Sequence, residues 1–168
     1  MAAESILKYL NLFVDGRGYA GKIEEYTPPA LALALEEFRG GGMDAPIDID
    51  MGTEKLTCGF VLVSYDADVL ALWGLKAGAD VQITARGSLE NPDGSTEKVA
   101  HKMRGKIVSR DPGTWGSGNK PSLTVQCSLI YYQEKIGDRV VLELDPINMV
   151  RVVDGVDQLA EHRKNIGR

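Results

Sequence analysis

The chain has 168 residues, of which 43% are hydrophobic and 26% charged, as expected for one soluble globular domain with a buried core. The formal net charge of −5 argues against a basic nucleic-acid reader, whose surface would carry clustered Lys and Arg. No apolar run approaches membrane-spanning length, and the N-terminal "MAAESILKYL" lacks the apolar region of a signal peptide, so no membrane anchor is expected.

The first third of the chain alternates apolar and polar residues with a period of two, which predicts strands. Segments 8–14 and 19–27 are predicted strands, joined by the glycine-rich "DGRGYAGK" (15–22). In "ALALALEEF" (30–38) the alternation favours a strand, although Ala, Leu and Glu are helix formers by propensity. A long glycine-loaded loop, "RGGGMDAPIDIDMG" (39–52), is predicted next, and loops of this length in compact domains tend to be functional or disordered.

The remaining segments predict more strands and two helices. Alternation resumes at 53–64, and "DADVLALWG" (66–74) has the cap, apolar face and terminal glycine of a helix. A second, short helix is predicted over 154–167, because its acidic residues come first and its basic residues last. Further strands are predicted at 80–89, 96–110, 122–134 and 139–145. The prediction is a mainly β, antiparallel sandwich or barrel with one internal helix and a short C-terminal helix, in a single domain over 1–168.

The glycines at 15–22 spell two phosphate-binding motifs, G-x-G-x-x-G and G-x-x-x-x-G-K. Both motifs need a helix immediately afterwards, because its N-terminus supplies the N–H groups that bind phosphate. Here a strand pattern and Pro28 follow, and Ile23 stands where a P-loop has Ser or Thr. A turn between strands is therefore the preferred interpretation.

No other catalytic, cofactor or metal motif is recognised. "DIDMG" (48–52) lacks the ligand positions of a calcium loop, and the two histidines fit no metal-binding spacing. Cys58 and Cys127 are predicted to be buried thiols in a reducing compartment, with a disulfide left open.

One strand carries a basic face. In "TEKVAHKMRGKIVSR" (96–110) the cations alternate with apolar residues, so they share the face opposite Val99, Met103 and Ile107. A solvated outer face and a contact with an acidic partner are both open interpretations. The face comprises Lys98, Lys102, Arg104 and Lys106, with Arg110 further along.

Two long segments, "EEFRGGGMDAPIDIDMG" (36–52) and "ELDPINMVRVVDGVDQLAEHRKNIG" (143–167), resemble the major tail tube proteins of contractile-tailed bacteriophages and their relatives in R-type bacteriocins. Shorter matching pieces are "LNLFVDG" (10–16), "TPPAL" (27–31), "MRG" (103–105) and "DPGTW" (111–115). The resemblance runs in order along nearly the whole chain, and 53–95 is its least motif-rich part.

The resemblance implies a structural protein and not an enzyme, with no cofactor. Family members form hexameric rings that stack into a hollow tube, whose lumen is lined by a continuous β-barrel like that of type VI secretion tubes. The implied partners are other copies of the chain, the tail sheath protein, the tape-measure protein, and the baseplate and tail terminator proteins. DNA would pass through the lumen without specific binding, in a virion tail assembled in the host cytoplasm.

Three residue sets are assigned on this basis. A β-barrel built across subunits uses open sheet edges for assembly, and a long loop reaches a neighbour. The predicted inter-subunit loop comprises Arg39, Gly40, Gly41, Gly42, Met43, Pro46, Ile47, Ile49 and Met51. A negative lumen would repel phosphates, and the candidates on predicted strands are Glu24, Glu25, Glu54 and Glu134. The basic face, Lys98, Lys102, Arg104 and Lys106, is then expected to point outward to the sheath.

The alternatives are the tube of a bacteriocin-like particle without DNA, a non-polymerising β-barrel binding module, and a nucleotide-dependent enzyme built on the glycine loop. Rings or tubes in electron micrographs would favour a tube protein, and a nucleotide-induced thermal shift would favour the enzyme.

Overall fold

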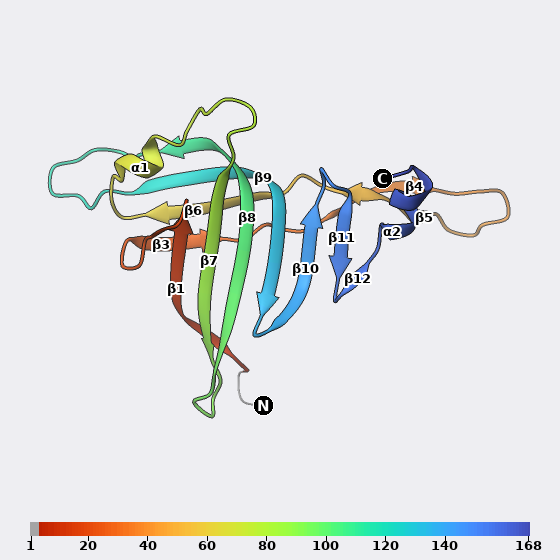
Figure 1. The fold of residues 1–168 in the computed structure, drawn as a ribbon, viewed down its shortest axis with the longest axis horizontal. Helices are drawn as coiled ribbons and strands as arrows, with labels where there is room; N and C mark the ends of the chain where they lie inside the picture. Colours follow the sequence, from red (N-terminus) through yellow and green to blue (C-terminus); the bar gives the residue numbers. More distant parts are fainter. Residues whose placement is uncertain (1–3) are drawn as a thin grey trace.

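Antiparallel strands dominate the computed structural model, which describes residues 4–168 (Figure 1). The strands are β1 (Ile6–Val14), β2 (Arg17–Gly18), β3 (Ile23–Thr27), β4 (Leu33–Phe38), β5 (Ile47–Thr53), β6 (Thr57–Leu62), β7 (Val81–Glu90), β8 (Thr96–Asp111), β9 (Leu123–Ile136), β10 (Arg139–Asp145), β11 (Val150–Val153) and β12 (Val156–Asp157). The helices are α1 (Ala67–Leu70) and α2 (Ala160–Asn165). The predicted mainly β, antiparallel fold with an internal and a C-terminal helix is confirmed.

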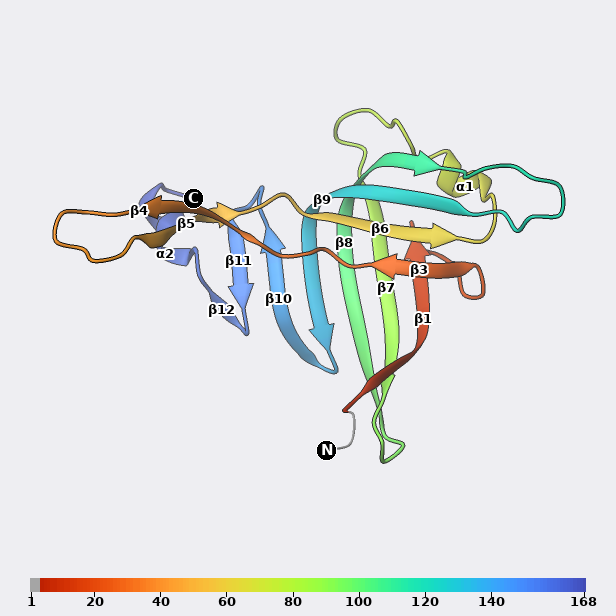
Figure 2. The same cartoon turned by 180° about the vertical axis from the view of Figure 1, so that it is seen from behind.

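The main sheet has the order β12-β11-β10-β9-β8-β7-β1-β2, and it branches at β9. The first half of β9, Leu123–Ser128, pairs with β6, whereas the second half pairs with β10. Because β6 also pairs with β3, these two strands form a second layer that crosses one face of the main sheet, behind it in Figure 1 and in front of it in Figure 2. The core lies between the two layers.

The core consists of the alternate residues that the strand patterns place on one face. Phe60 and Leu62 of β6 belong to the same core cluster as Leu12 of β1 and Ile83 of β7, all nearly inaccessible to solvent. Gly105 of β8 allows the closest backbone approach, because a Cβ atom there would lie 2.0 Å from the carbonyl oxygen of Ser128. The two cysteines face each other across β6 and β9 as free, buried thiols.

Three predicted elements differ from the structure. The loop at 39–52 is shorter than predicted, because 47–52 forms most of β5 and pairs with β4. The helix at 66–74 is the four-residue α1, where Asp66 caps the N–H groups of Asp68 and Val69. The helix at 154–167 is reduced to α2, because Val156–Asp157 adds a short strand to β11. Strand β11 itself was not predicted.

Strands β4 and β5 form a separate two-stranded sheet, which we call the arm (residues 33–53). Both views show the arm projecting sideways from the main body, with α2 and the C-terminus near its base (Figures 1 and 2). The arm therefore extends the molecule beyond its core.

Candidate assembly interface

The arm exposes its large apolar side chains. None of the residues of β4 or β5 is buried, and their large apolar side chains are between 41% and 60% exposed. They are Leu33, Leu35, Phe38, Ile47, Ile49 and Met51, with Leu31 just before the arm. An isolated two-stranded hairpin is at best marginally stable in water, and contiguous exposed apolar surface marks a contact site. The arm therefore has the composition of a surface that another chain covers.

The tip of the arm is the loop 39–46, which begins with a tight turn. Met43 donates its backbone N–H to the carbonyl oxygen of Gly40 at 3.2 Å, and the Arg39 Nε donates to the Met43 carbonyl oxygen at 3.3 Å. Gly42 between them has a φ of 86°, a left-handed conformation that favours glycine. The triple glycine thus forms a turn just after β4, and Pro46 comes directly before β5.

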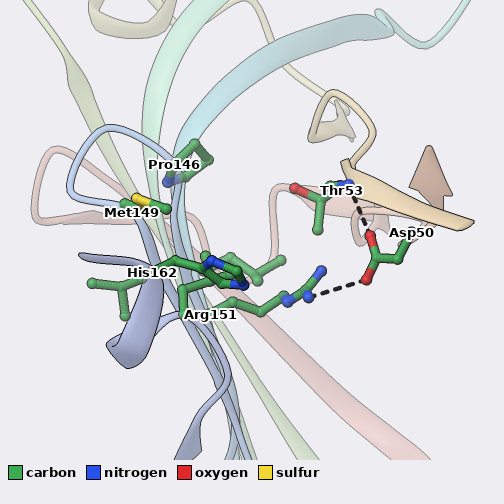
Figure 3. Close-up of a pocket in the computed structure, with 10 residues that line it drawn as sticks. Asp50, Thr53, Pro146, Met149, Arg151 and His162 are labelled. Carbon is green, nitrogen blue, oxygen red and sulfur yellow. Dashed lines mark hydrogen bonds and ion pairs between the residues drawn. The ribbon is translucent and has the colours of Figure 1, made fainter. Parts of the chain in front are cut away.

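A single ion pair is described between the side chains of the arm and those of the C-terminal strands. Arg151 of β11 places its Nη2 atom 3.1 Å from the Asp50 Oδ2 atom, and the Gly52 N–H donates to Oδ1 at 2.8 Å (Figure 3). These two bonds, first the Gly52 N–H and then Arg151, lower the pKa of Asp50. The sequence pattern could not reveal this pair, because its members are 101 residues apart.

A cavity of about 460 Å³ lies beside this ion pair, between β5 and the C-terminal segment (Figure 3). Thr53 belongs to the arm, and Pro146, Met149 and His162 come from the C-terminal side. On that side Arg163 binds Asp157 and donates to the carbonyl oxygen of Met149. Hydrogen bonds and an ion pair within the C-terminal segment hold it in place, and an open cavity separates part of it from the base of the arm.

The four cations of the basic face do share one side of β8, since Met103, Gly105 and Ile107 between them are buried. Lys98 pairs with Asp138 at 3.1 Å, and Lys106 donates to the carbonyl oxygen of Leu75 at 3.1 Å. Lys102 and Arg104 have no ion pair among residues 4–168.

A groove of about 450 Å³ contains both of these unpaired cations. Its other lining residues are uncharged except Asp145, which accepts two hydrogen bonds from Asn148.

The four candidate lumen acids lie in different surroundings. Glu24 of β3 pairs with Lys120 at 2.7 Å, and Glu25 is exposed on the same strand. Glu54 was expected on a strand but follows the end of β5, where its backbone N–H donates to the Ala32 carbonyl oxygen. Glu134 points at the ring of His101, with an Oε1–Nε2 distance of 3.9 Å. The structure does not gather these acids into one cluster.

His101 of β8 is partly buried, with 13% of its side chain exposed. Its Nδ1 atom lies 3.0 Å from the Tyr26 hydroxyl, and its ring meets Tyr132 edge-on. Burial lowers the pKa of His101, although Glu134 opposes the shift.

The glycine-rich segment 15–22 forms the turn and short strand after β1, and β3 follows instead of a helix. Lys22 lies 3.8 Å from Asp66, so its charge already faces a carboxylate. Among residues 4–168 no group of three metal-ligating side chains comes together. In the same range, no helix is long and apolar enough to span a membrane.

These features define a class of protein: a small β-rich structural subunit with an apolar hairpin that its own core does not bury. The comparisons with known proteins give the family. The family model of phage tail tube protein FII matches residues 4–167, and the chain belongs to this family. It is therefore a structural component of a phage tail and not an enzyme.

Two curated relatives cover almost the whole chain. The tail tube protein of Escherichia phage P2 is 35% identical over 175 residues, 99% of each chain. The major tail tube protein of Serratia phage KSP20 is 30% identical over 157 residues, covering 92% of this chain and 91% of its own. Among solved structures, a chain of the anti-feeding prophage baseplate superposes with a TM-score of 0.50 at 11% identity, covering 77% of this chain and 91% of the other. This likeness concerns the fold alone.

Proposed function

We propose that the chain forms hexameric rings, and that these rings stack into the inner tube of a contractile tail. The observation that carries the proposal is the arm, which exposes its apolar residues beyond the core of its own chain. A contact of this kind between different patches of identical subunits closes into a ring or continues as a helical polymer. The open edges of β4 and β5 also offer backbone groups to a neighbour.

The proposed partners follow from the position of an inner tube. The sheath would surround the tube, the tape-measure protein would fill the lumen during assembly, and DNA would later pass through it. The baseplate and terminator proteins would bind the two ends, and the tail would be assembled in the host cytoplasm. The relatives are phage proteins, which favours a phage tail over a bacteriocin particle.

The lumen wall is proposed to carry Glu25 and Glu54, which have no ion pair within residues 4–168. Glu24 and Glu134 are weaker candidates, because Lys120 and His101 lie beside them. The substitutions Glu25→Lys and Glu54→Lys should slow DNA release from particles, since a positively charged lumen wall attracts phosphates. An unchanged release rate would speak against a lumen position.

Electron microscopy tests the assembly. The purified chain should form rings or tubes of uniform width, and replacing 39–52 by a Gly/Ser linker should abolish them. The linker variant should lose the strand signal of the arm but keep its cooperative thermal unfolding, because 39–52 contributes nothing to the buried core. Normal tubes from this variant would refute the role of the arm.

A further inference from the structure

The net charge of the arm accounts for most of the net negative charge of the chain. Residues 33–53 hold five carboxylates and one arginine, a net charge of −4, whereas the whole chain carries −5. The carboxylates are Glu36, Glu37, Asp44, Asp48 and Asp50. The rest of the chain is therefore close to neutral in net charge, and the excess of negative over positive charge lies on one projecting element.

Two of these acids face each other. Glu37 of β4 stands directly opposite Asp48 of β5 in the antiparallel ladder, so both side chains lie on one face of the arm. Like charges at such a position destabilise a sheet unless a cation lies nearby. Asp50 on the same face has Arg151, but no ion pair to Glu37 or Asp48 exists within residues 4–168.

The main sheet carries two cations that have no acidic partner. Lys102 and Arg104 lie two residues apart on β8, on the face turned away from the core. Their cross-strand neighbours are uncharged: Thr84 and Gln82 on β7, and Gln133 and Tyr131 on β9. The Arg104 Nε atom is buried and has no hydrogen-bond partner among the described residues. A buried, charged donor of this kind is costly unless an acceptor reaches it.

We infer that the Glu37–Asp48 pair on the arm of one copy docks on Lys102 and Arg104 of a neighbouring copy. The arm of the same chain points away from β8, so the contact joins two molecules (Figures 1 and 2). Each carboxylate gains a cation, and the like-charge repulsion is relieved on both sides. The inference rests on the proposed self-assembly and adds the acceptor surface for the arm.

From the sequence, the basic face is expected to meet the sheath. A second copy of the chain fits the basic face better than the sheath does, because the chain itself carries unpaired acids on the arm that complement the unpaired cations of that face. The sheath is the competing outcome of the test.

The test reverses the charges on each side. The arm variant is Glu37→Lys/Asp48→Lys, and the face variant is Lys102→Glu/Arg104→Glu. Each should fold but form no rings or tubes at the concentration at which the wild type assembles. The concentration needed for assembly should rise roughly tenfold or more. The quadruple variant should assemble again, as should an equimolar mixture of the two double variants. The matched control, Glu4→Lys/Glu97→Lys, changes the net charge of the chain equally at two exposed positions outside the arm and should assemble like the wild type.

Three outcomes would overturn the inference. The first is that the face variant assembles like the wild type. If this variant also loses binding to the sheath protein, the basic face contacts the sheath and not a second copy. The second is failure of both the quadruple variant and the mixture to recover. The third is absence of rings from the wild type itself, which would refute the proposed self-assembly as well and is thereby distinguished from the other two.

Discussion

At the scale of single residues, the buried surroundings of His101 couple the stability of the fold to pH. Tyr26, Tyr132 and Glu134 contact or face the imidazole, and burial lowers its pKa below the usual value of 6.5. The unfolded chain therefore binds a proton at a higher pH than the folded chain does. The stabilisation is fully present above the unfolded pKa and is lost as the pH falls through and below it.

His101→Gln should reduce this pH dependence. We expect the midpoint of thermal unfolding to fall less for this variant than for the wild type between about pH 7.5 and about pH 5.5, the window around the unfolded pKa of His. Differential scanning fluorimetry across this range measures the effect. The control is His162→Gln, which removes an exposed histidine of α2. Equal slopes for His101→Gln and the wild type would contradict the prediction.

At the scale of elements, the arm and the core strands have similar patterns but different roles. Both alternate large apolar residues, yet those of β6 are buried between two layers and those of β4 and β5 are about half exposed. Side chains that stay in water contribute little to the free energy of folding, whereas they gain from burial in an interface.

Phe38→Ser/Ile47→Ser should therefore leave the free energy of unfolding almost unchanged and yet abolish assembly. Phe60→Ala in the core should cost about 3–5 kcal/mol of folding stability. Urea unfolding followed by tryptophan fluorescence compares the two, and sedimentation velocity measures assembly. A large loss of stability in the arm variant would show that the arm belongs to the fold and not to the interface.

At the scale of the whole molecule, the separation of an acidic arm from a near-neutral body predicts salt-sensitive association. Opposite charges attract across about 8 Å at physiological ionic strength but only about 3 Å in 1 M salt. Raising the sodium chloride concentration from about 0.05 M to about 0.5 M should therefore raise the concentration needed for assembly. Sedimentation at each salt concentration measures this threshold.

The neutral variant Glu37→Gln/Asp48→Gln is the control for this prediction. It should show a shallower dependence on salt, because the charges that are screened are missing. Assembly of the wild type that is independent of salt would mean that apolar contacts alone hold the copies together.

Much of this protein could be predicted from its sequence because strand periodicity is local. Alternation located most of the strands and placed Met103 and Ile107 on the buried side of β8. Propensity was the weaker guide: "ALALALEEF" is rich in helix formers but forms β4, because pairing with β5 outweighs a small intrinsic preference. The motifs at 36–52 and 143–167 pointed to the tail tube family, which the family model and the two relatives confirm.

Only the tertiary structure decided which surfaces lie together. Residues 47–51 alternate apolar and acidic side chains, but the nearby glycines and Pro46 favoured a loop, and only the pairing with β4 shows that they form a strand. The two-residue β12 depends on its partner β11 and is too short to give a local pattern. The Asp50–Arg151 pair and the surroundings of His101 join residues far apart in the chain, and no local rule connects them. The sequence by itself determined which side chains share a face of each strand, because this alternation depends only on neighbouring residues. Pairing across the sheet decided which charged side chains remain without a partner.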